Sequence, residues 1–167
     1  MLFTEDKNMM KDSFKTGIGF GITSGVITTL GLMIGLSSGT ESVLAVVGGV
    51  LTIAIADAFS DSLGVHVAKE FENKHTTKEI WESTLTTLLS KFFVATTFMI
   101  PLFIFSLQTA VIISTIWGLL LLGCFSYIIA MNRKVTPWHV VSEHMLIAIV
   151  VIIISHYVGF FIRNTFI

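Results

Sequence analysis

The order of apolar and polar residues along the chain predicts five membrane-spanning helices. A window of about 19 residues, moved along the sequence, finds five apolar stretches close to the ~20 residues that a helix needs to cross roughly 30 Å of hydrocarbon. Charged residues gather in short segments between these stretches, as spanning helices require. We place the spans at residues 16–37, 43–66, 85–107, 109–131 and 140–162.

Composition agrees with this pattern. Hydrophobic residues make up 53% of the 167 residues and charged residues 13%, with a mean hydropathy of +0.86, whereas a soluble domain carries about 25% charged residues. We therefore expect an all-α polytopic membrane protein with five transmembrane helices per subunit, forming a single transmembrane domain over residues 1–167. Its surroundings would be the lipid bilayer of the cell (inner) membrane in a prokaryote, or of a vacuolar or other organelle membrane in a eukaryote.

Basic residues predict the orientation, because Lys and Arg in short loops favour the cytoplasmic side. If the spans alternate, only Arg163 falls on the side of the C-terminus. We therefore expect a cytoplasmic N-terminus and an outside C-terminus. The net charge of −1, without a basic patch, does not favour nucleic-acid binding. The basic residues expected on the cytoplasmic side are Lys7, Lys11, Lys15, Lys69, Lys74, Lys78, Lys91, Arg133 and Lys134.

Two aspartates, Asp57 and Asp61, lie one helical turn apart inside the second span. A carboxylate at the centre of a spanning helix costs about 2.5–3.5 kcal/mol on insertion scales, so it must face protein or water and is a candidate functional group. The i, i+4 spacing puts both on one face, where they could bind a divalent cation, or share a proton when no ion is bound. Alternatively, each is protonated or bonded to hydroxyls of a neighbouring helix.

Further candidate ligands lie in the first, second and fifth spans. Glu143, His144 and His66 enter the bilayer from the cytoplasmic side and would extend the polar path from the aspartates. Histidine with carboxylate suits Fe²⁺, Mn²⁺ or Zn²⁺ better than Ca²⁺. In the first span, Ser24 and Thr28 are either weak oxygen ligands along the pathway or donors to their own helix.

The segment 67–84 is expected to be a short cytoplasmic Glu/His loop, leading through a short helix into the third span. Its acidic and histidine side chains form either a solvated charged face or a low-affinity site that collects cations. The candidate capture residues are Glu70, Glu72, His75 and Glu79.

Small residues and one proline indicate how the helices pack. The first span carries two glycine triplets spaced by four, 17/21/25 and 31/35/39, and this spacing lets helix backbones approach closely in lipid, within one subunit or between two. Pro101 is expected to kink the third span.

The first two spans resemble the vacuolar iron transporter (nodulin-like) family. The resemblance rests on GITSGVITTLGLMIGLSSG followed by GGVLTIAIADAFSDSLGVHVAKE; the five-span layout, the proline of the third span and the closing HYVGFFI also fit. It covers essentially the whole chain, as a short form in which the large cytoplasmic metal-binding insert is reduced to the Glu/His loop. Where the family has aspartate, methionine and glutamate, this chain has Ser24, Asp57 and Asp61.

The resemblance implies a homodimer that moves Fe²⁺, and often Mn²⁺, out of the cytosol in exchange for protons, along a path near the two-fold axis. We therefore expect a proton-coupled transporter of divalent transition metals, with the metal as substrate and no cofactor. The alternatives are a cation-selective pore lined by carboxylates of two subunits, and a non-transporting scaffold subunit whose acids are interhelical hydrogen-bond partners. An enzyme is not expected, because the sequence shows no nucleophile–base pair, zinc-ligand spacing or phosphate-binding glycine loop.

Overall fold

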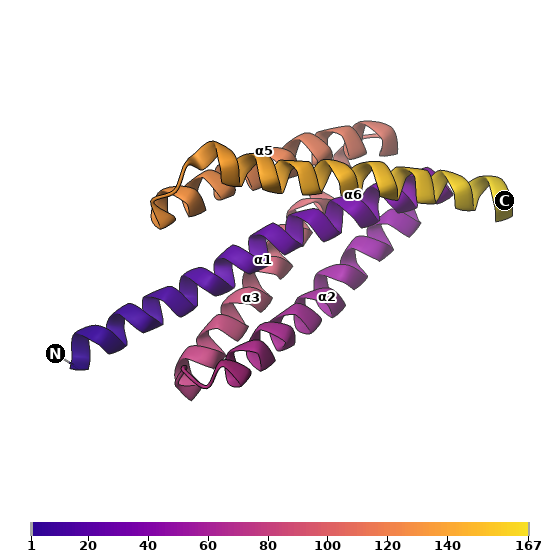
Figure 1. The fold of residues 1–167 in the computed structure, drawn as a ribbon. Coiled ribbons are helices and arrows are strands. Elements are labelled where there is room, and N and C mark those ends of the chain that lie inside the picture. The colour runs from indigo at the N-terminus through magenta and orange to yellow at the C-terminus, as the bar shows by residue number, and fades with distance from the viewer. Residues whose placement is uncertain (1, 167) are drawn as a thin grey trace.

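The computed structural model describes the backbone of residues 2–166 and the side chains of residues 12–166 (Figure 1). Five of its helical segments are long and apolar enough to cross a membrane, which confirms the predicted spans, with α3 and α4 together making the third. The helices are α1 (Leu2–Thr40), α2 (Val43–Glu72), α3 (Thr77–Thr97), α4 (Met99–Ile104), α5 (Leu107–Arg133) and α6 (Pro137–Phe166).

The connection between α2 and α3 is much shorter than the loop expected over residues 67–84, because only residues 73–76 lie outside the helices. Asn73 ends α2 in the left-handed conformation, with a φ of 51°, which asparagine tolerates. Thr76 and Glu79 then form a reciprocal capping box: the Thr76 hydroxyl accepts from the Glu79 N–H, and the Glu79 carboxylate accepts from the Thr76 N–H. The cap therefore starts α3 at residue 77, so the short helix expected before the third span is continuous with the first part of that span.

The third span is broken where Pro101 predicts a kink. Proline has no N–H to donate to the carbonyl of residue 97, and α3 ends at Thr97. The chain turns at Phe98 and continues as α4. The Thr97 hydroxyl accepts a hydrogen bond of 3.1 Å from the indole N–H of Trp117 in α5, so the break is tied to a neighbouring helix.

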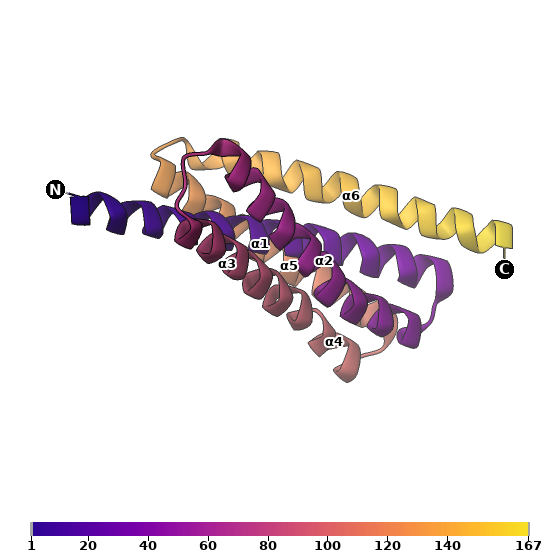
Figure 2. The same ribbon diagram turned by 90° about the horizontal axis from the view of Figure 1, so that it is seen from below.

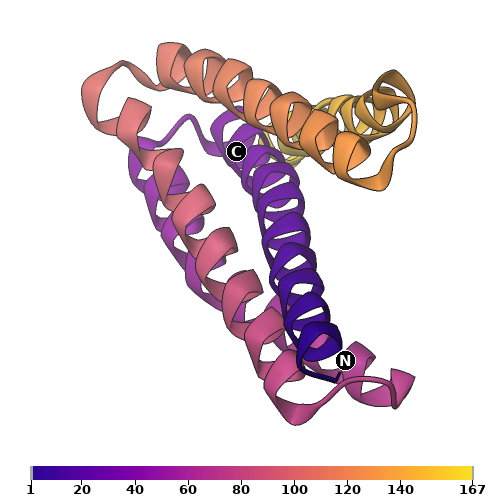
Figure 3. The same ribbon diagram turned by 90° about the vertical axis from the view of Figure 1, so that its left-hand side faces the viewer.

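Helix α1 is the central element, because it contacts α2, α3, α5 and α6. The turns joining α2 to α3 and α5 to α6 lie at the end of the bundle where α1 begins, and α6 ends at the other (Figure 2). An end view shows α1 between the α2–α3 pair and the α5–α6 pair (Figure 3). Every described basic residue except Lys91 and Arg163 lies toward the end where α1 begins. The side chains of Lys7 and Lys11 lie outside the described residues, and the orientation in the membrane stays a prediction.

Both glycine triplets of α1 are used for packing within the chain. A Cβ added at Gly17 would lie 2.6 Å from the Ser83 carbonyl oxygen, and one added at Gly21 would lie 2.8 Å from the Thr87 carbonyl oxygen. The first triplet therefore packs against α3. A Cβ added at Gly39 would come within 3.3 Å of a backbone oxygen of α6. The glycines therefore let one helix approach two partners closely.

Large apolar side chains cover the surface of the bundle, and its interior holds hydroxyl and charged side chains together with apolar ones, as in a lipid-facing protein. Large apolar residues such as Ile153 and Phe161 are exposed, while hydroxyl residues such as Thr87 and Ser126 are buried and donate to carbonyls one turn back in their own helices. Because lipid is as apolar as these surfaces, packing and hydrogen bonds hold the helices together. One buried apolar cluster consists of Val26, Leu30, Phe98, Leu122 and Ala148.

Candidate functional site

Asp57 and Asp61 converge on a lysine of the neighbouring helix. The Lys91 Nζ atom lies 2.5 Å from Asp57 Oδ2 and also forms an ion pair with Asp61 Oδ2. The prediction that both carboxylates share one face of α2 is therefore confirmed. Asp57 lies at the middle of α2, and Lys91 lies at the middle of the third span, Thr77–Ile104, so the cluster sits about halfway along the helices.

Ser24 of α1 completes the cluster. Its hydroxyl donates to Asp61 Oδ2 over 2.6 Å and lies 2.9 Å from the Lys91 Nζ, which donates to it. Lys91 also donates a hydrogen bond to Asp61 Oδ2. Asp57 Oδ2 is close enough for an ion pair, but no well-aligned hydrogen bond reaches it in the described part of the chain. Three helices thus meet through one ammonium group.

The Lys91 side chain is buried, whereas those of Asp57 and Asp61 are partly exposed. The Lys91 side chain is 1% exposed, whereas those of Asp57 and Asp61 are 27% and 22% exposed. The lysine stem fits because α1 has Gly25 beside it: an added Cβ would come within 3.3 Å of Lys91 Cγ. This finding corrects the expectation that Lys91 belongs to the cytoplasmic basic residues.

The charges of the cluster do not cancel. Two carboxylates and one ammonium leave a net charge of −1 when all three are ionised. Removing one partner of a buried ion pair typically costs about 3–5 kcal/mol, because it leaves an uncompensated charge. The atoms that face the ammonium are oxygens of Asp57, Asp61 and Ser24, and such hard ligands suit Mn²⁺, Mg²⁺ and Ca²⁺ better than soft metals.

His66 lies beyond the carboxylates along α2 and has partners of its own. Its Nδ1 is 3.0 Å from the Thr84 hydroxyl, its Nε2 is 3.4 Å from Glu70 Oε1, and its ring packs edge-on against Trp81. The histidine therefore joins α2 to α3. Among the residues with described side chains, no group of three His, Cys, Asp or Glu is arranged to hold a metal ion.

Glu143 and His144 lie on α6, away from α2. His144 Nδ1 is 2.7 Å from the Ser126 hydroxyl of α5. Both residues line a cavity of about 610 Å³ between α1, α5 and α6, which Lys15 and Arg133 also line. The structure thus brings Asp57 and Asp61 together, while His66 lies apart from them on α2, and Glu143 and His144 line a different cavity.

The predicted capture residues flank the short α2–α3 turn. Glu72 Oε2 lies 2.9 Å from His75 Nε2, and His75 Nδ1 lies 3.9 Å from Glu79 Oε2. Glu79 is fully buried by its capping role, and its Oε1 has no hydrogen-bond partner in the described part of the chain. Glu70 contacts His66 instead. The predicted capture residues therefore take part in three acid–histidine contacts around a short turn.

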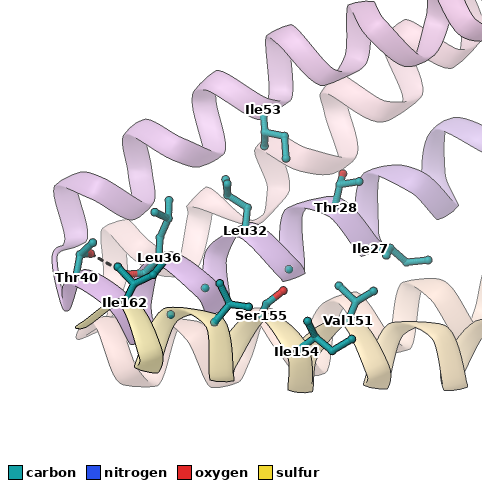
Figure 4. A pocket seen from close by; sticks show the side chains of 15 residues that line it. Ile27, Thr28, Leu32, Leu36, Thr40, Ile53, Val151, Ile154, Ser155 and Ile162 are labelled. Atoms are coloured by element: carbon teal, nitrogen blue, oxygen red, sulfur yellow. Dashed lines mark hydrogen bonds between the residues drawn. The ribbon is translucent and has the colours of Figure 1, made fainter. Parts of the chain in front are cut away.

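Thr28 lines an apolar cavity of about 590 Å³ between α1, α2 and α6 (Figure 4). Its hydroxyl donates to the Ser24 carbonyl over 2.9 Å, which is the second of its two expected roles. The only other polar side chains of the lining are Thr40 and Ser155. This cavity offers no charged ligand for a cation.

Lys91 is the site residue that sequence reasoning assigned to the wrong depth. The signal that could have found it is the run Thr76-Thr77-Lys78-Glu79, which matches the capping-box pattern and starts the helix earlier. A third span that begins at residue 77 has Lys91 at its centre. Comparisons with protein-family models and with curated proteins found no match for this chain, so the resemblance to vacuolar iron transporters stays a prediction.

Proposed function

We propose that this protein is a proton-coupled transporter that moves a divalent transition-metal cation out of the cytosol, with Asp57 and Asp61 as the cation site. The supporting observation is the position of the cluster: two partly exposed carboxylates converge halfway along five membrane-spanning helices, and one lysine neutralises only half of their charge. Ionisable groups inside a membrane are costly, and they mark ion and proton paths.

The charge balance favours exchange over simple binding. A divalent cation added to a cluster of charge −1 would leave a net charge of +1 in a region of low dielectric, which is unfavourable. The return of a proton for each cation reduces the charge that crosses the membrane. A cation-for-proton exchanger therefore fits this cluster better than a cation-selective pore does.

The ligand set favours Mn²⁺ over Fe²⁺ as the preferred substrate. In the described part of the chain, the atoms that pair with the Lys91 ammonium are carboxylate or hydroxyl oxygens. Oxygen ligands suit Mn²⁺, whereas imidazole ligands favour iron and later metals. The histidines nearest in sequence or depth, His66 and His144, bond hydroxyl groups elsewhere.

An open stripe of small residues on α2 supports a homodimer. The stripe is exposed, is spaced by four residues and runs beside the two aspartates. A Cβ added at Gly48 or Gly64 would meet nothing within 4 Å, unlike one added at any glycine of the α1 triplets. A second copy of α2 packed on this stripe would cover the exposed parts of both carboxylates. The stripe consists of Gly48, Thr52, Ala56, Ser60 and Gly64.

The transport proposal is tested with purified protein in liposomes, with Mn²⁺ or Fe²⁺ outside and a trapped dye that reports internal pH. We expect cation movement coupled to opposite proton movement in the wild type, and loss of both in Asp57→Asn. The control is Glu41→Gln, which removes a carboxylate from an exposed pair at the far end of α1 and should preserve transport.

Each other outcome of this assay has a definite meaning. Cation flux that moves no protons would identify a pore. Retained flux in folded Asp57→Asn would refute the site. If wild-type protein neither binds nor moves Mn²⁺ or Fe²⁺, the transport proposal is wrong.

A scaffold subunit is the second candidate, because Lys91 already contacts both carboxylates. In that role the cluster would only hold α1, α2 and α3 together. It predicts that the wild type binds no cation and that Asp57→Asn lowers the stability of the fold without changing any flux.

The dimer is tested by cysteine cross-linking in a Cys124→Ala background. Ser60→Cys on the stripe should form an intermolecular disulfide in lipid nanodiscs or native membranes. Leu146→Cys, exposed on α6, is the matched control and should not. Equal cross-linking of the two variants would argue against the α2 interface.

A further inference from the structure

The Lys91 ammonium occupies the place that a bound cation would need. Its Nζ contacts Asp57 Oδ2, Asp61 Oδ2 and the Ser24 hydroxyl. Two of these three oxygens belong to Asp57 and Asp61, which form the cation site of the proposed function. An ammonium donates to the same lone pairs that a metal ion coordinates, and two positive charges at such short range repel each other.

We propose that Lys91 is a tethered competitor of the transported cation: its ammonium fills the empty site and must leave these oxygens before a cation binds there. The inference rests on the proposed function and adds a residue that sets affinity. A transport site must bind its ion strongly enough to take it up and weakly enough to release it. A competing side chain keeps cation binding weak enough for release, without the need for a second ion.

The surroundings of Lys91 fit this role. The charged groups that face its ammonium are Asp57 and Asp61 of α2, while α1 contributes only the Ser24 hydroxyl; no other described side chain pairs with it. The stem is held between α3 and the backbone of α1 at Gly25. This packing places the ammonium against the carboxylates, which keep an exposed side through which a cation can approach.

Two substitutions distinguish competition from a structural role, because the two roles predict opposite rankings of Lys91→Arg and Lys91→Gln in Mn²⁺ affinity. Lys91→Arg keeps a positive charge and binds carboxylates through two parallel hydrogen bonds, so the site stays filled and the Kd for Mn²⁺ rises at least tenfold. In Lys91→Gln the side chain carries no charge and cannot compete with Mn²⁺ for the carboxylate oxygens, so the Kd for Mn²⁺ falls at least tenfold. A lysine needed only for ion pairs would be replaced well by Arg and badly by Gln.

The measurement is Mn²⁺ binding to purified protein in lipid nanodiscs, read from the electron paramagnetic resonance signal of free Mn²⁺. Thermal unfolding of each variant checks that it is folded. The matched controls are Lys69→Arg and Lys69→Gln, at a second buried lysine that donates to Ser13 near the end of α2. Both should bind Mn²⁺ like the wild type. Lys91→Met, unbranched and uncharged, repeats the test if Lys91→Gln does not fold.

The outcomes distinguish this inference from the function it rests on. Weaker binding by Lys91→Arg with tighter binding by Lys91→Gln or Lys91→Met supports the tethered competitor. The tethered competitor is overturned if folded Lys91→Arg binds Mn²⁺ as tightly as the wild type, even if no neutral variant folds. It is also overturned if a folded neutral variant binds Mn²⁺ no more tightly than the wild type does. Absence of Mn²⁺ and Fe²⁺ binding by the wild type refutes the proposed function instead.

Discussion

The contact of α1 with α3 at Gly21 permits a quantitative test of the packing that holds the site. In Gly21→Ala, the new Cβ would lie 2.0 Å from the Ser90 hydroxyl, 2.8 Å from the Thr87 carbonyl oxygen and 3.2 Å from the Lys91 backbone nitrogen. The hydroxyl can rotate away, but the two backbone atoms cannot. The helices must therefore separate locally by about 0.6 Å to restore the 3.4 Å of ordinary contact with the carbonyl oxygen.

The expected cost follows from two opposing effects. Replacing glycine by alanine inside a helix stabilises it by about 1 kcal/mol, and overpacking a tight contact costs about 1–3 kcal/mol. Gly19→Ala is the matched control, because a Cβ there would meet nothing within 4 Å and only the first effect applies. Gly21→Ala should therefore be less stable than Gly19→Ala by about 1–3 kcal/mol.

The same separation of α1 from α3 would also affect the site, because Ser24 lies about one turn after Gly21 on α1. The hydrogen bond from Lys91 to Ser24 is 2.9 Å long, and a separation of about 0.6 Å would stretch it to about 3.5 Å, where a hydrogen bond is weak. If the proposed function is right, we expect Gly21→Ala to impair cation transport as well as stability, and Gly19→Ala to leave transport unchanged.

Equilibrium unfolding of both variants by titration with SDS in mixed micelles measures the difference, with helicity followed by circular dichroism. Equal unfolding free energies for the two variants would refute the close α1–α3 contact. A less stable Gly21→Ala with full transport would instead refute the link between helix spacing and the site.

Two further predictions concern the ends of the bundle. Thr76→Ala removes the hydroxyl that caps α3 and should lower the free energy of unfolding by about 1 kcal/mol, while the exposed neighbour Thr77→Ala should change it less; equal effects in thermal unfolding would contradict the capping box. Glu41→Gln breaks the exposed ion pair with Arg163 and should change the free energy of unfolding by less than about 1 kcal/mol at physiological salt; a larger change in the same assay would mean that the pair contributes more than exposed pairs usually do.

Some features of the site were predictable because they depend on one helix only. The i, i+4 spacing places Asp57 and Asp61 on the same face of any α-helix, and the apolar residues around them require a spanning segment. The break before Pro101 is equally local, because it follows from a missing N–H.

The position of Lys91 depended on where its helix begins. A hydropathy window starts the third span after the charged residues around Glu82, whereas the capping box starts the helix at residue 77. Hydropathy measures the transfer of side chains to lipid, and it does not register the hydrogen bonds that begin a helix. A lysine expected early in the third span, among the cytoplasmic basic residues, is therefore a buried partner of two aspartates.

Residue order was enough to predict five spanning helices, the shared face of the two aspartates and the close packing of the glycine triplets, since each depends on periodicity and residue size within one helix. The packing of the first triplet on α3 and of the second on α6 is visible only in three dimensions, as is the meeting of Ser24, Asp61 and Lys91 from three helices. Such contacts depend on which helices become neighbours and at what depth, and helix–helix packing in lipid sets both.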